Sequence, residues 1–92
     1  MKTIRVKIYG KVQNVNMRSS ICQKALVLGI KGYVKNNPDN IAIVDSVFQA
    51  DEKKLSEMID FIKSSPGRSG VEDVKIETLK SEGFKAFSIR YY

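Results

Sequence analysis

The chain has 92 residues, of which 42% are hydrophobic and 28% are charged. This length and composition are typical of one folded domain over residues 1–92, and they exclude a disordered chain. The net charge of +6 favours anionic partners such as nucleic acid, an anionic membrane or a phosphorylated small molecule. The chain has no histidine and one cysteine, Cys22, which excludes the usual zinc sites and any catalytic pair that needs histidine.

The sequence also argues against a membrane protein. No apolar run approaches the roughly 20 residues that a membrane-spanning helix needs. Residues 1–7 carry a charge at every second or third position, which is typical of a strand and not of a secretory signal peptide. We therefore expect a cytoplasmic protein that does not bind membranes.

The first elements in chain order are a strand and a helix. Apolar and basic residues alternate over residues 3–9, which indicates a half-buried strand. A polar, asparagine-rich loop follows at residues 11–16. Helical spacing of apolar residues predicts a helix over residues 17–28, with Asn16 as its N-cap and Gly29 as its C-terminal stop.

A hairpin and a second helix come next. Residues 30–35 and 41–48 predict two strands, joined by a turn at residues 36–40 that is rich in Asn, Asp and Pro. Asp51 is predicted to cap a second helix, which extends to about Ser64 and buries one apolar face.

The last third of the chain predicts two more strands after a breaker-rich loop at residues 65–70. Residues 71–79 predict a strand with Val74 and Ile76 pointing inward, and residues 86–91 predict a fifth strand. The order βαββαβ indicates an α+β protein with a ferredoxin-like sandwich. In this fold both helices cover one face of an antiparallel sheet, here of four or five strands.

The first candidate for chemistry is the connection from Gly10 to Arg18. A strand-to-helix loop presents unpaired backbone N–H groups beside the positive end of a helix, which suits an anion. The guanidinium of Arg18, in the first helical turn, can bind phosphate oxygens in bidentate fashion. The alternative is that Arg18 is an ordinary solvated helix residue. Periodicity alone favours that alternative.

The second candidate is Asn36, at the start of the hairpin turn. Its amide can cap the turn through the local backbone. It can instead accept a hydrogen bond from a water molecule through its carbonyl oxygen. Composition leaves both interpretations open.

Two motifs resemble the signatures of the acylphosphatase family. Residues 10–18, with the sequence GKVQNVNMR, resemble a motif that runs glycine, basic, Val-Gln-Gly-Val, any residue, aromatic or Met, then Arg. Residues 32–36, with the sequence GYVKN, resemble the second motif of glycine, aromatic, Val, basic and Asn. Residues 87–91 resemble the closing strand of many members, and the similarity covers essentially the whole chain.

This resemblance implies an enzyme that hydrolyses acyl phosphates to carboxylate and phosphate without a metal or other cofactor. Arg18 and Asn36 would be the catalytic residues, with Arg18 holding the phosphoryl group and Asn36 orienting a water for in-line attack. The substrate-binding segment would consist of Gln13, Asn14, Val15, Asn16, Met17 and Arg18. The partner would be a small acyl phosphate, phosphate or a similar anion.

Asn14 departs from the family pattern, since it stands where the first motif has glycine. Asn is well tolerated in left-handed backbone, but its side chain could crowd the anion. The alternative is therefore a catalytically weak or silent module that binds phosphate-type anions or a protein partner. We expect no nucleic-acid partner, because the aromatic strand motifs of RNA-binding sheets are absent. Charges spread along both helices predict a monomer.

Overall fold

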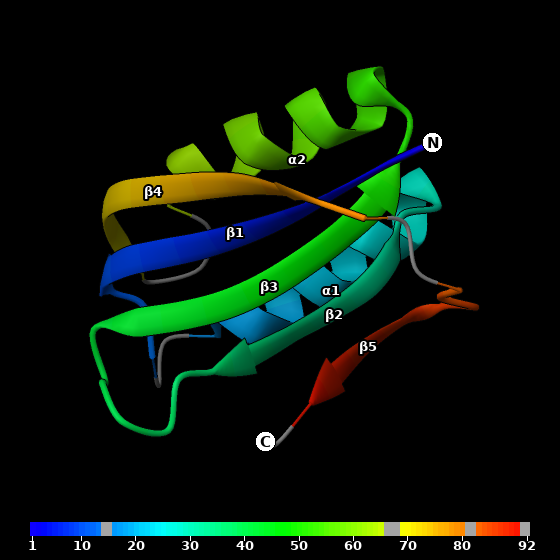
Figure 1. Cartoon of the computed structure of the whole chain (residues 1–92). Helices are drawn as coiled ribbons and strands as arrows, with labels where there is room; N and C mark the ends of the chain where they lie inside the picture. The colour runs from blue at the N-terminus through cyan, green and yellow to red at the C-terminus, as the bar shows by residue number, and fades with distance from the viewer. Residues whose placement is uncertain (14–15, 66–68, 81–82, 91–92) are drawn as a thin grey trace.

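The computed structural model describes residues 1–13, 16–65, 69–80 and 83–90. These residues form a sheet and two helices, and both helices lie on the same face of the sheet (Figure 1). The elements are β1 (Lys2–Lys11), α1 (Met17–Leu28), β2 (Lys31–Asn36), β3 (Ile43–Ala50), α2 (Glu52–Lys63), β4 (Gly70–Leu79) and β5 (Phe87–Arg90). This arrangement confirms the predicted α+β sandwich. In the described part of the chain, neither helix is long and apolar enough to cross a membrane.

The sheet is mixed and not wholly antiparallel. Its strand order is β4-β1-β3-β2-β5, with β4 and β5 at opposite edges (Figure 1). The pairs β1–β3, β1–β4 and β2–β3 are antiparallel, whereas β5 pairs with β2 in parallel. The prediction of an antiparallel sheet is therefore wrong for β5. β4 ends at the end of the sheet where β2 begins, so a strand that starts there beside β2 must run parallel to it.

The core lies between the sheet and the two helices, where the apolar periodicities placed it. Its buried side chains include Ile4, Val6 and Ile8 from β1; Met17, Ile21 and Ala25 from α1; Val34, Val44 and Phe48 from β2 and β3; Leu55, Met58 and Ile62 from α2; and Phe87 from β5. Two of the three predicted helix boundary signals, Asp51 and Gly29, are in use. The Asp51 side chain accepts a hydrogen bond from the Lys54 N–H at 3.0 Å, and the N–H of Gly29 closes the last turn of α1.

The hairpin turn between β2 and β3 is longer than predicted, because β3 begins at Ile43 and not at residue 41. Asn40 holds this part of the turn, since its side-chain oxygen accepts from the Ala42 N–H at 2.9 Å and its carbonyl accepts from the Ile43 N–H at 3.2 Å. The backbone N–H groups of Ala42 and Ile43 are thus bonded within the turn and are not available for pairing with a neighbouring strand. As a result, Ile41 is 79% exposed at the turn.

Ile76 is a second departure from the prediction, because its side chain is 49% exposed and not part of the core. It lies opposite buried Val6 in the register of β1 and β4, and therefore on the helix side of the sheet. However, β4 is an edge strand, and an open groove of about 360 Å³ between α2 and the β1–β4 edge leaves Ile76 partly uncovered. Val74 is half-buried against the core.

Gly32 permits an unusually close approach of β2 to β3. Its φ is +133°, and a Cβ atom at this position would lie 1.9 Å from the carbonyl oxygen of Val47. Gly32 is also the register partner of Phe48 on β3 and Phe87 on β5, whose rings stack with their centroids 5.7 Å apart. The missing side chain therefore lets two core rings from the flanking strands meet across β2.

Replacing Gly32 with Ala should destabilise the fold by at least about 2 kcal/mol, because it combines a positive φ with a backbone clash. The urea midpoint of unfolding should fall accordingly. Gly83→Ala is the matched control, since no atom lies within 4 Å of a Cβ built at Gly83. Equal midpoints for the two variants would contradict the close approach at Gly32.

Candidate active site

The N-terminus of α1 is not capped by the side chain that precedes it. Asn16 occupies the predicted N-cap position, but its backbone is left-handed (φ 64°, ψ 18°) and its side chain makes no capping hydrogen bond. The expectation of a side-chain cap is therefore wrong, because capping geometry requires extended backbone at this position. The first N–H groups of a helix have no partner within the helix and lie at its positive end. This turn thus suits an anion.

Gly10 redirects the chain as it leaves β1 for α1. The pairing of β1 with β4 shifts register between Tyr9 and Gly10. Gly10 has φ +130°, and a Cβ atom there would lie 2.2 Å from the carbonyl oxygen of Gly70. Its N–H donates to the Ala42 carbonyl at 2.9 Å, so the connection turns toward the hairpin between β2 and β3. The first residue of the first motif is thus a glycine for steric reasons.

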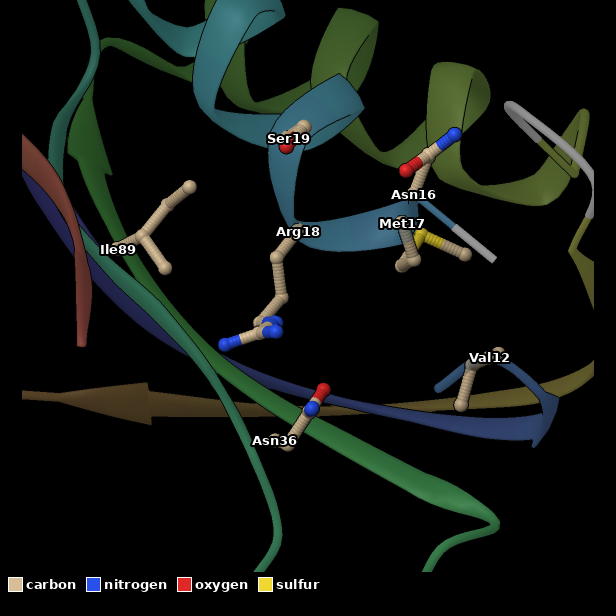
Figure 2. A pocket seen from close by; sticks show the side chains of 7 residues that line it. All are labelled: Val12, Asn16, Met17, Arg18, Ser19, Asn36 and Ile89. Carbon is tan, nitrogen blue, oxygen red and sulfur yellow. The ribbon is translucent and has the colours of Figure 1, made fainter. Parts of the chain in front are cut away.

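A cavity of about 250 Å³ opens beside this helix terminus (Figure 2). Its described lining residues are Val12, Asn16, Met17, Arg18, Ser19, Asn36 and Ile89. The side chain of Arg18 extends from α1 toward the sheet, and the amide of Asn36 points from β2 toward it (Figure 2). The structure therefore brings the two predicted catalytic residues to one cavity. We call this space the helix cavity.

Asn36 faces the helix cavity because of the strand period. Gly32 and Val34 lie on the helix side of β2, and Asn36 follows at the same two-residue spacing. The Oδ1 atom of Asn36 is buried and has no hydrogen-bond partner among the residues that the structure describes. A buried acceptor of this kind is costly unless a water or ligand satisfies it.

The side chain that caps the hairpin turn belongs to Asn37 and not to Asn36. Asn37 accepts from the Asp39 N–H at 2.9 Å and donates to the carboxylate of Asp45 at 3.1 Å. This is the Asx-type turn that composition allowed at the hairpin. Asn36 is therefore available to a ligand in the helix cavity.

Gln13 acts through its side chain in a way that the sequence analysis did not predict. Its Nε2 atom donates to the carbonyls of Asn37 at 3.1 Å, Asn40 at 3.0 Å and Ile43 at 2.8 Å. One of its two hydrogens is therefore shared between acceptors. Gln13 fastens the β1–α1 connection to the hairpin and does not line the helix cavity. Asn14 and Val15, which were also predicted to bind substrate, lie outside the described residues.

A second open groove of about 390 Å³ adjoins the helix cavity and shares Arg18 and Asn36 with it. Its other described lining residues are Gln13, Asn37, Pro38, Ile41 and Arg90. We call it the hairpin groove. Sequence reasoning missed Ile89 and Arg90 as lining residues, although both belong to the closing motif at residues 87–91.

Comparisons with known proteins show which family the chain resembles. A family model described as Acylphosphatase matches residues 4–89. An acylphosphatase of Lactobacillus gasseri is 42% identical over 93 residues, covering 99% of this chain and 100% of its own length. An acylphosphatase of Methanocella arvoryzae is 36% identical over 90 residues, covering 98% of this chain and 100% of its own.

The similarity extends to three dimensions. The crystal structure of an acylphosphatase from Bacillus subtilis superimposes with a TM-score of 0.92 at 29% identity. The match covers 99% of this chain and 100% of the other. By sequence, by fold and by the two motifs that meet at the helix cavity, the chain belongs to the acylphosphatase family.

Proposed function

We propose that the protein hydrolyses the carboxyl-phosphate bond of acyl phosphates in the helix cavity, with Arg18 binding the phosphoryl group and Asn36 positioning the attacking water. One observation carries the assignment of these roles. A guanidinium from the first turn of α1 and an amide from the end of β2 line one cavity, at a helix N-terminus that the Asn16 side chain does not cap.

Phosphoryl binding rests on charge and on donor geometry. The phosphoryl group would lie against the N–H groups at the start of α1, where the helix dipole favours negative charge. Arg18 adds two parallel N–H donors and a full positive charge. Phosphoryl transfer depends mainly on positioning and on stabilisation of charge at the equatorial oxygens. Arg18 and the N–H groups of α1 would supply both the positioning and the charge stabilisation.

Water positioning rests on the unsatisfied acceptor of Asn36. Its Oδ1 atom would accept one hydrogen of a water and so direct a lone pair of that water toward phosphorus. The water oxygen bonds to phosphorus as the bond to the acyl oxygen breaks on the opposite side. A carboxylate leaves, and the water's proton passes to an oxygen of the phosphate. A carboxylate is a stable anion, so the reaction needs no proton donor for the leaving group.

The proposal includes a monomer that acts in the cytoplasm on a small anion, with no nucleic-acid or membrane partner. Charged residues spread along both helices support the monomer. The lone Cys22 cannot form a disulfide within the chain, which suits a reducing compartment.

Wild-type protein should hydrolyse benzoyl phosphate at the same rate with and without a chelator. Arg18→Ala and Asn36→Ala should each lower kcat/KM by a factor of about 100 or more, as expected for a lost transition-state contact. Inorganic phosphate as a competitive inhibitor separates the two roles. Its inhibition constant should rise strongly in the Arg18 variant and little in the Asn36 variant.

Arg5→Ala is the control for the loss of one arginine. Arg5 lies in β1 and pairs with exposed Glu77 at 3.1 Å, so its loss should leave kcat/KM within twofold of wild type. A folded wild-type protein that binds phosphate but leaves benzoyl phosphate intact would support the silent-module alternative. In that case Asn14→Gly tests whether the departure from the motif is the cause.

Gln13→Ala should lower kcat about tenfold, because the hairpin that follows Asn36 would lose its attachment to the loop before Arg18, and small misplacements of reacting groups are costly. The phosphate inhibition constant should change less than twofold, since Arg18 and the helix N-terminus stay in place. Steady-state kinetics with benzoyl phosphate measure both quantities.

Asp39→Ala is the control for that experiment, because Asp39 lies in the same turn with an exposed side chain and contributes through its backbone N–H. Its kcat should match wild type. If the two variants lose equal activity, the hydrogen bonds of Gln13 are not what positions Asn36.

A further inference from the structure

We propose that the open face of the sheet binds a short chain of linked phosphate groups between β1 and β4. This face is the one opposite to the two helices (Figure 1). A groove of about 250 Å³ lies there, and its described lining includes Arg5, Lys7, Tyr9, Lys75 and Glu77. We call it the open-face groove. Three basic side chains against one carboxylate give it a positive potential, which attracts anions.

The sheet separates the open-face groove from the helix cavity. Val6 and Ile8 of β1 are fully buried beneath the helices, and side chains alternate between the two faces of a strand. Arg5, Lys7 and Tyr9 therefore project from the opposite face. An anion in the open-face groove would not occupy the phosphoryl site, so the inference goes beyond the proposed function and does not depend on it.

The two lysines of the groove form a like-charge pair that a bound anion would relieve. Lys7 and Lys75 are register partners on neighbouring strands, and like charges directly opposite each other destabilise a sheet. Among the described residues, no Asp or Glu side chain forms an ion pair with either lysine. Asp45 is the register partner of Lys7 on β3, but its carboxylate accepts a hydrogen bond from the Asn37 amide at 3.1 Å. An anion between the two lysines would remove their repulsion.

Neighbouring side chains hold two of the three cations in place. The Nζ atom of Lys75 lies 5.4 Å from the centroid of the Tyr9 ring, a cation–π contact. Arg5 donates to the carboxylate of Glu77 at 3.1 Å, and this bond uses one of the five N–H groups of the guanidinium. Both cations therefore keep donors that a phosphate oxygen can accept from.

The spacing of the cations favours several linked phosphates over a single one. Arg5 and Lys7 are two residues apart on β1, a step of about 7 Å along the strand. Lys75 lies across from Lys7, so the three positive charges form a short row. A chain of phosphates can contact this row at more than one point, whereas one phosphate bonds at a single point.

The same lining argues against a nucleic-acid ligand. Proteins that bind single strands stack the bases on exposed aromatic rings. Tyr9 is the one aromatic residue in the described lining of the open-face groove, it is half-buried, and Lys75 already lies against its ring. The groove thus offers cations for a phosphate chain but no free platform for a base.

The test measures tripolyphosphate binding by isothermal titration calorimetry at low ionic strength. Replacing both groove lysines, with Lys7→Gln and Lys75→Gln together, should weaken binding about tenfold or more, because each lysine makes a charge-assisted contact. The matched control combines Lys53→Gln and Lys63→Gln, which remove the same charge from exposed positions on α2. The control should change the affinity less than about twofold. Equal losses in the two double variants would overturn the proposal, since net charge alone would then explain binding.

Arg18→Ala separates the open-face groove from the helix cavity, which also suits an anion. Tripolyphosphate should still bind this variant, and the two pairs of lysine substitutions are compared in the same background. The amide signals of residues 5–9 and 73–77 should shift in nuclear magnetic resonance spectra when tripolyphosphate is added. If Arg18→Ala abolished binding, or if these signals stayed in place, the open-face groove would not be the site.

Unfolding in urea checks the lysine pair independently. Lys75→Gln should raise the urea midpoint in the absence of ligand, because it removes the like-charge contact with Lys7. Saturating tripolyphosphate should raise the midpoint of wild type more than that of this variant, since a ligand of the native state stabilises it. A wild-type midpoint that ignores tripolyphosphate would contradict the proposal.

Two further ligands test which anion the groove recognises. Orthophosphate should bind Arg18→Ala protein about tenfold more weakly than tripolyphosphate, because it makes fewer of the charge-assisted contacts. A short single-stranded RNA should also bind more weakly than tripolyphosphate. Equal affinity for orthophosphate would reject the requirement for linked phosphates, and tighter binding of RNA would assign the open face to nucleic acid instead.

Discussion

The register of β2 against β3 is the constraint on which the site depends. Side chains on a strand alternate between faces, and the observed register puts Gly32, Val34 and Asn36 together on the helix side. A slip of one residue would bring Lys35 or Asn37 to the helix cavity in place of Asn36. Two packing features oppose such a slip: Val34 is fully buried, and the backbone at Gly32 lies too close to β3 for any side chain. The core therefore selects which amide faces Arg18.

A correct register fixes the direction of Asn36 but not the distance from β2 to the loop before α1. Gln13 holds the loop at a fixed distance from the hairpin, because its side chain donates hydrogen bonds to three hairpin carbonyls. Carbonyl oxygens only accept hydrogen bonds, so the three of them also determine that the nitrogen end of the Gln13 amide faces the hairpin. The loop and the hairpin thus form one connected unit. The sheet supplies rigidity, and the Gln13 amide joins the loop that precedes Arg18 to the hairpin that follows Asn36.

The spacing of apolar residues, together with Gly, Pro, Asn and Asp at element boundaries, predicted the elements and the core. Burial of an apolar face is a local property of the sequence. The parallel pairing of β5 was not predictable in this way, since it depends on where β4 ends relative to β2. The hydrogen bonds of Gln13 were likewise not predictable, because they join segments that are distant in the sequence. The role of Asn36 stayed open in the sequence because its neighbour, Asn37, is equally able to cap a turn. Their positions separate them, because Asn36 is the last residue of β2 and lines the helix cavity, whereas Asn37 lies in the turn that follows.

The chemistry of the lining explains why acyl phosphates suit this cavity better than phosphate esters. An ester releases an alkoxide, which needs a proton donor, whereas an acyl phosphate releases a carboxylate that is stable without one. The described lining of the helix cavity contains one guanidinium, two amides, one hydroxyl at Ser19 and apolar side chains, with no carboxyl group or thiol. Such a site can bind and orient a phosphoryl group and a water but offers little general acid catalysis. Selectivity would then come from the leaving group, so that only a substrate whose departing oxygen needs no proton would react quickly.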